Sequence, residues 1–162
     1  MFRIASHDQG WASHGTRGSY EGAWSWFDAV VNHPTHGRIP ARAADSNPNT
    51  TDDNNDTNDT NDNGDETTDY DQVGLWKLQS NRVGHRDTMD YTITWHYLDD
   101  IQPDSEEADK IEREQGRGRY TLDGHIVREL QVGDSITVWA RARFPGWQNH
   151  VEGMAVRVFW AV

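Results

Sequence analysis

The clearest pattern along this chain is an alternation of apolar and polar residues with a period of two. The segment 135–147, SITVWARARFPGW, follows a Gly-Asp turn and ends at a Pro-Gly pair. Successive side chains of a strand point to opposite faces, so one face of this segment is small and apolar. The other face carries an indole and two guanidinium groups, from Trp139, Arg141 and Arg143. The pattern therefore predicts a strand that seals a core on one side and presents recognition chemistry on the other.

Similar patterns predict further strands at 2–5, 23–31, 73–78, 90–98, 120–122 with 125–130, and 154–162. No helical pattern is long enough for a βαβ unit. Ser105 can cap a turn or two of helix in the charged segment 99–119, but we expect a loop there because that segment has few apolar residues. Seven or eight short strands joined by turns favour an all-β fold, an antiparallel β-sandwich or jelly roll, as one domain over residues 1–162.

One long segment interrupts these strands. Residues 45–69 contain only Ser, Asn, Pro, Thr, Asp, Gly and Glu. A segment without hydrophobic side chains cannot offset the entropy of ordering its backbone, so we predict a disordered insertion. Residues 59–64 match the opening of an EF-hand loop, but Tyr70 stands where a bidentate Glu belongs. We favour a solvated acidic tract over a calcium site.

Charge and composition exclude several classes of function. The formal net charge is −12, and ten of the acidic residues lie between Asp45 and Asp71, so the rest of the chain is nearly neutral. No basic surface is indicated, and we expect no nucleic-acid partner. The absence of cysteine excludes disulfides and thiolate metal sites. The N-terminus has no apolar run of signal-peptide length, and no segment is long enough to cross a membrane; we therefore expect a cytoplasmic protein.

Eight tryptophans provide the main candidates for binding. Indole faces stack on sugars and other flat groups, and Arg pairs with hydroxyls or carboxylates. We predict a ligand site at Trp139, Arg141, Arg143 and Trp147. The alternative is ordinary sheet packing, with Trp139 covered by a loop and the arginines paired with acids on a neighbouring strand. We expect the core to contain Trp24, Trp26, Trp95 and Trp160.

A second candidate is the loop Ser-His-Asp-Gln-Gly-Trp at 6–11, which adds His7, Asp8 and Trp11 to the predicted ligand-binding residues. Together with His14, two of these residues can supply metal ligands, but their spacing lacks the local scaffold of known sites. We favour a structural role, in which Asp8 fixes a turn and Trp11 closes the end of the sandwich. No nucleophile motif or phosphate loop is present, and we predict neither a metal nor a cofactor.

Three blocks carry a resemblance to known proteins: SHDQGW at 6–11, GAWSWF at 22–27 and VWARARFPGWQN at 138–149. In this order they resemble a small family of uncharacterised fungal, Trp-rich proteins. The resemblance implies a β-sandwich of the galactose-binding-like or jelly-roll kind. It implies no activity, because none is attached to that family.

The sequence leaves three functions open. The first is a non-enzymatic binding module for carbohydrate or another polar small ligand, held on the Trp/Arg face. The second is a protein–protein interaction scaffold whose partner meets the same face. The third is a hydrolase or metal-dependent enzyme that uses the loop with His7, Asp8 and His14. The oligomeric state is also open.

Overall fold

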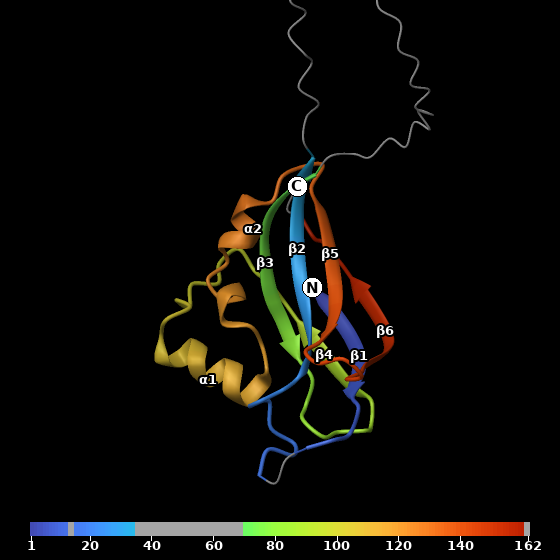
Figure 1. Cartoon of the computed structure of the whole chain (residues 1–162). Coiled ribbons are helices and arrows are strands. Elements are labelled where there is room, and N and C mark those ends of the chain that lie inside the picture. Colours follow the sequence, from blue (N-terminus) through green and yellow to red (C-terminus); the bar gives the residue numbers. More distant parts are fainter. Residues whose placement is uncertain (13–14, 35–69, 161–162) are drawn as a thin grey trace, which may run out of the picture.

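The structure, a computed structural model, describes residues 1–12, 15–34 and 70–160. Its strands form two antiparallel sheets packed face to face, with the orders β4-β1-β6 and β3-β2-β5 (Figure 1). The described residues thus form an antiparallel β-sandwich, which confirms the predicted all-β class. The bounds are Phe2–Asp8 for β1, Ser25–Pro34 for β2, Tyr70–Ser80 for β3, Met89–Ile93 for β4, Ser135–Ala142 for β5 and Asn149–Val156 for β6.

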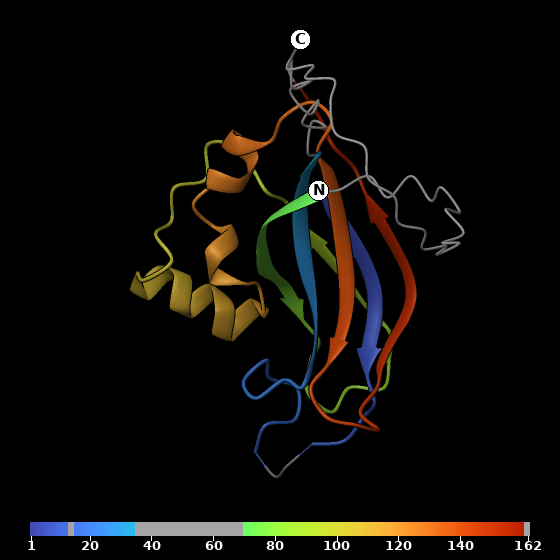
Figure 2. The same ribbon diagram turned by 45° about the horizontal axis from the view of Figure 1, so that its top comes forward.

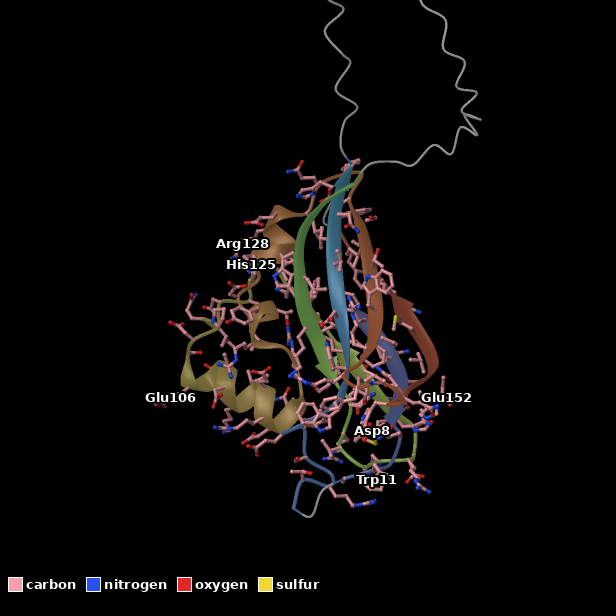
Figure 3. All side chains as sticks on the ribbon, in the orientation of Figure 1. Asp8, Trp11, Glu106, His125, Arg128 and Glu152 are labelled. Atoms are coloured by element: carbon pink, nitrogen blue, oxygen red, sulfur yellow. The ribbon has the colours of Figure 1, made fainter. Side chains whose placement is uncertain are left out.

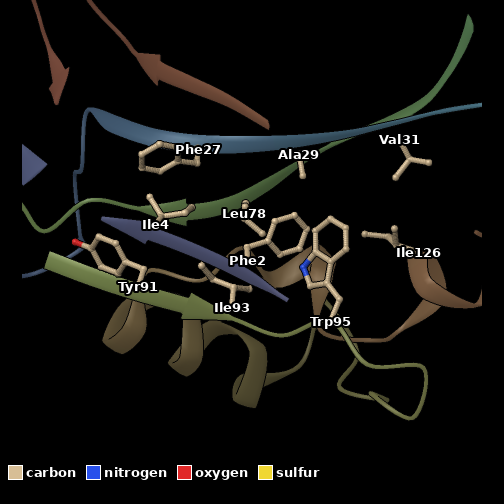
Figure 4. Close-up of a cluster of buried hydrophobic side chains, with 10 residues drawn as sticks. All are labelled: Phe2, Ile4, Phe27, Ala29, Val31, Leu78, Tyr91, Ile93, Trp95 and Ile126. Atoms are coloured by element: carbon tan, nitrogen blue, oxygen red, sulfur yellow. The ribbon is translucent and has the colours of Figure 1, made fainter. Parts of the chain in front are cut away.

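The hydrophobic core lies between the two sheets (Figure 4). It follows from the alternation, because every second residue of β1 is buried, beginning with Phe2 and Ile4. Ile136 and Val138 of β5 pack against the core from the predicted apolar face. The fully assembled cluster contains Phe2, Ile4, Phe27, Ala29, Val31, Leu78, Tyr91, Ile93, Trp95 and Ile126.

The expected placement of four tryptophans in the core is correct only for Trp95, which is 8% exposed. Trp24 and Trp160 are exposed, and Trp26 is half-buried. Aliphatic residues and Phe fill the narrow space between two three-stranded sheets. Of the four expected tryptophans, Trp24, Trp26 and Trp160 are outside this cluster.

Residues 106–129 contain three short helical elements, where a loop and a pair of strands were predicted. A 3₁₀ turn, η1 (Arg119–Thr121), and a short helix, α2 (His125–Glu129), replace the predicted strand pair. Gly124 has a φ of 71°, a left-handed conformation that favours glycine and starts α2. The helix then places Ile126 in the core, so its apolar residues are buried without a strand partner.

A second helix, α1 (Glu106–Gln115), stands where a loop was expected. Its own pattern is weak, but docking supplies the missing stability. Ala108 is fully buried, and Arg119 pairs with Asp109 at 2.7 Å and with Glu112 at 2.6 Å. Figures 1 and 2 show α1 and α2 lying beside β3 rather than over β5.

Ser105 caps α1, since its hydroxyl accepts a hydrogen bond from the Ala108 backbone N–H at 3.1 Å. We expect Ser105→Ala to lower the free energy of unfolding by about 1 kcal/mol, because a helix N-terminal donor loses its acceptor. Urea titration followed by circular dichroism measures this loss. Ser105→Asp should retain most of the stability, because Asp is also a good N-cap. An unchanged midpoint in Ser105→Ala would show that the cap contributes nothing.

The remaining differences concern strand ends. β4 ends at Ile93, before the predicted strand end at 98, and Tyr97 beyond it is exposed. β6 occupies 149–156, earlier than the predicted 154–162. The predicted acidic insertion, 45–69, lies outside the described residues. Pro34 pairs with Tyr70, so the chain between them connects neighbouring strands of one sheet.

Candidate functional site

The predicted Trp/Arg face exists on the outer side of β2 and β5, where the two strands pair in antiparallel register. Trp26 lies opposite Arg141, and Asp28 lies opposite Trp139. The next pair follows from the hydrogen bond between the Arg143 N–H and the Trp24 carbonyl, at 2.9 Å. Paired residues of antiparallel strands share a face. We call this surface the Trp–Arg ladder: Trp24, Trp26, Asp28, Trp139, Arg141 and Arg143.

Asp28 holds the middle of the ladder. One of its carboxylate oxygens accepts a hydrogen bond from the Trp26 indole N–H at 2.9 Å. The other accepts from Arg141 Nε at 3.2 Å. The Arg141 guanidinium also lies over the Trp139 ring, 5.3 Å from its centroid, in a cation–π contact. Trp139 is nevertheless 51% exposed, so its indole is oriented but still open to solvent.

Arg143 has a different environment from Arg141. Its guanidinium lies 5.2 Å from the centroid of the Trp24 ring and 5.9 Å from that of Phe144. Phe144 contacts Trp147 edge-on, with centroids 6.0 Å apart. Within the described part of the chain, no carboxylate pairs with Arg143. The ladder therefore has a neutralised cation at Arg141 and an uncompensated one at Arg143.

These contacts decide between the two interpretations of the face. The sheet-packing alternative is correct for Arg141, which pairs with an acid on the neighbouring strand. Among the described residues it does not hold for Trp139, which is half-exposed with no loop over it, or for Arg143, which stacks on aromatic rings. Trp147 is half-buried and supports Phe144 rather than extending the exposed surface.

His7 and Asp8, which were predicted in a loop, are the last two residues of β1, and Trp11 follows the strand. Figure 3 shows Asp8 and Trp11 at the end of the sandwich. The His7 ring stacks on His150 at 4.5 Å, and its Nδ1 bonds the Asp8 carbonyl. Asp8 is buried, consistent with the structural role that we favoured. Trp11 is 72% exposed, so it does not close the end of the sandwich.

A buried polar network around Asp8 was not predicted from the sequence. Ser25 Oγ donates to Asp8 at 3.0 Å, and the Gly84 N–H donates to its other carboxylate oxygen at 2.9 Å. Asn81 Nδ2 donates to Ser25 Oγ at 3.0 Å and to Asn149 Oδ1 at 2.8 Å. These side chains come from both sheets, so the network fixes one end of the sandwich. Asp8, Ser25 and Asn149 come from the three quoted blocks, whereas Asn81 and Gly84 lie outside them.

The network also positions the ladder. Asn149 Nδ2 donates to the carbonyl oxygens of Trp26 at 2.9 Å and Arg141 at 3.2 Å. These are the two backbone positions from which opposed ladder side chains project. A change inside the network should therefore move the ladder as well.

A separate apolar cavity of about 410 Å³ opens at the opposite end of the sandwich from Asp8. Its lining includes Trp95, which is buried, and Phe159 and Trp160, which are exposed. It contains none of the predicted site residues. Sequence patterns could not find it, because its lining comes from segments that are far apart in the chain: 1–2, 94–97, 127–136 and 156–160.

The described residues contain no cluster of three or more His, Cys, Asp or Glu side chains arranged to hold a metal ion. His14, the third member of the predicted metal set, lies outside them. Both carboxylate oxygens of Asp8 are already hydrogen-bonded within the protein. Asp8, at the end of β1, thus acts as a structural joint between the two sheets.

Within residues 1–12, 15–34 and 70–160, no helix is long and apolar enough to span a membrane. Comparison of the chain with protein-family models, with curated proteins and with solved structures gives no match. The resemblance to fungal Trp-rich proteins stays a prediction. The function must be argued from the site itself.

Proposed function

We propose that this protein is a non-enzymatic binding module that holds a carbohydrate or another polar small ligand on the Trp–Arg ladder. The observation that carries the proposal is the half-exposed indole of Trp139, held in place beneath a guanidinium that is itself fixed by Asp28. A side chain that is already oriented loses little entropy when it binds. The face is therefore prepared to meet a flat ligand.

The charge of the ladder indicates which ligands fit best. Arg143 lies against aromatic rings and has no acidic partner in the described chain. Arg143 is exposed, so a ligand can reach its guanidinium, which can bind a carboxylate through a bidentate hydrogen bond. Trp139 and Arg143 are four strand residues apart, about 13 Å, so an oligosaccharide with one ring over Trp139 and a carboxylate on a ring farther along, near Arg143, would satisfy both groups. A uronate-containing oligosaccharide is therefore the preferred ligand class within the proposal.

The test compares a uronate-containing oligosaccharide with a neutral oligosaccharide of the same length, by calorimetry and tryptophan fluorescence. We expect the uronate form to bind more tightly, and Trp139→Ala to weaken binding at least about tenfold, equivalent to about 1.4 kcal/mol. Arg143→Gln should remove the preference for the acid. Trp160→Ala, at the opposite end of the sandwich, is the matched control and should bind normally.

The proposal fails if neither sugar binds, or if Trp139→Ala and Trp160→Ala bind equally well. A neutral sugar that binds as tightly as the uronate form would retain the carbohydrate site and refute the acidic preference. Because the ladder residues are on the surface, thermal unfolding should give nearly the same midpoint for each variant.

A protein partner on the same face is the second candidate function. Exposed Trp and Arg side chains dominate the binding energy of many protein interfaces, and both types are concentrated here. This candidate predicts that Trp139→Ala and Arg141→Ala weaken the binding of a protein while no sugar binds. The sugar titration therefore separates the two candidates.

A further inference from the structure

Strand β6 forms one free edge of the sandwich. Among the described strands, β6 pairs only with β1 in its sheet, and β5 pairs only with β2 in the other. A free edge presents unpaired backbone N–H and C=O groups, and soluble proteins usually protect it with Lys, Pro or a covering segment. Residues 149–156, NHVEGMAV, contain neither Lys nor Pro. Its register shift against β1 falls between Val151 and Gly153, at Glu152, so residues 153–156 form a regular stretch of edge without a bulge, Lys or Pro.

The inner face of β6 is also uncovered. Met154 and Val156 lie opposite Ile4 and Phe2, so their side chains point toward the space between the sheets. Ile4 and Phe2 are buried, yet Met154 and Val156 are each 39% exposed. The sandwich is therefore open along this side. Apolar side chains at core-facing positions remain in water unless another chain covers them.

The hydrogen bonds to β1 show which backbone groups of β6 are free. Arg157 and Met1 exchange two bonds, each of 2.8 Å. In an antiparallel pair, hydrogen-bonded positions alternate with positions whose N–H and C=O point away. Since Val156 and Met154 occupy the alternate positions, their N–H and C=O groups point to the free edge. A partner strand must pair with these two residues.

A second β6 strand fits this pattern. When two copies run antiparallel about a two-fold axis at Ala155, Met154 of one copy lies opposite Val156 of the second copy. Both positions have free backbone groups, and both side chains face inward, as paired residues must. Shifting the register by one residue would place inward side chains opposite outward ones. The strand is thus complementary to itself in this register.

The charges agree with the same register. Gly153 would lie opposite Arg157 of the second copy, and its missing side chain leaves room for the guanidinium. Glu152 is adjacent and on the outer face, because its carboxylate lies 3.9 Å from Nε2 of the outward-facing His7. Arg157 is exposed and makes no ion pair within the described chain. Two symmetric Glu152–Arg157 pairs would therefore form across the axis.

We propose that β6 pairs with β6 of a second copy of this chain about an axis at Ala155. The product is one continuous sheet with the strand order β4-β1-β6-β6-β1-β4. The side of the sandwich along β6, which is open in a single copy, is then covered by the second copy. The interface covers Met154 and Val156 and pairs their free backbone groups. It is independent of the Trp–Arg ladder, which lies on the outer face of the other sheet.

The test is a charge exchange measured by sedimentation velocity. The wild-type chain should be a dimer at micromolar concentration. Arg157→Glu places like charges on both symmetric contacts, and Glu152→Arg does the same with the opposite sign; each should raise the dimer dissociation constant at least about tenfold. The double variant restores both pairs and should dimerise again. An equimolar mixture of the two single variants should form a heterodimer, because every contact is then attractive.

Circular dichroism and unfolding midpoints check that the variants fold, as expected for exposed charges. A monomeric wild-type chain at high micromolar concentration would overturn the proposal. So would a dimer that is unaffected by both single variants, or a mixture that gives no heterodimer. Sugar binding by the wild-type chain and by the charge variants should be equal, so failure here is distinguishable from failure of the ladder.

Discussion

Replacing Asp8 with alanine is expected to lower the free energy of unfolding by about 3 kcal/mol. Asp8 is buried and accepts hydrogen bonds from Ser25 Oγ at 3.0 Å and from the Gly84 N–H at 2.9 Å. Without the carboxylate, both donors remain buried with fewer partners, and each unsatisfied group costs about 1–3 kcal/mol. This variant therefore tests whether the polar network holds the two sheets together.

The measurement is urea unfolding followed by tryptophan fluorescence. Asp90→Ala is the matched control, because Asp90 is an exposed acid on a neighbouring strand of the same sheet. Its effect should stay within about 0.5 kcal/mol. Equal midpoints for the two variants would show that Asp8 is not a structural joint. Asp8→Asn should fall between them, since one acceptor oxygen is retained.

The sequence predicted the fold where a strand buries one face and exposes the other. In β1 and β5 the two-residue period survives in the structure, because each packs one side on the core. The same method failed at 120–130, where a short apolar run fits a strand or a helix equally well. There tertiary contacts favour the helix, because Ile126 of α2 packs in the core. Such contacts leave no local signal.

Only the part of the candidate site that lies on a single strand could be predicted from the sequence. Alternation correctly places Trp139, Arg141 and Arg143 on one face, since that needs only one strand. It cannot identify the neighbouring strand or its register, and these bring Asp28 to Arg141 and Trp24 to Arg143. Different environments for two similar arginines are therefore a result of strand pairing. The alternation within a single strand does not reveal which strand lies beside it.

Gly118→Ala is expected to cost about 3 kcal/mol of stability and to release α1 from the sheet. The chain at 116–118 follows the edge of β3, and Ser80 N donates to the Gly116 carbonyl at 2.8 Å. A Cβ on Gly118 would lie 1.7 Å from the backbone carbonyl oxygen of Lys77. Backbone cannot yield as a flexible side chain can, so the whole segment must move outward. Amide hydrogens within α1 should then exchange faster.

Gly153→Ala is the matched control, because the same substitution meets no atom within 4 Å of the added Cβ and no left-handed backbone. Glycine within a strand is destabilising relative to alanine by about 0.5–1 kcal/mol, so this variant should be slightly more stable than the wild type. Urea unfolding at low protein concentration, where self-association does not contribute, compares the two variants. If Gly118→Ala lowers the free energy of unfolding and Gly153→Ala raises it, the loss in Gly118→Ala comes from its contact with β3. A similar loss in both would attribute that cost to chain flexibility instead, and would refute the tight packing of this segment against the sheet.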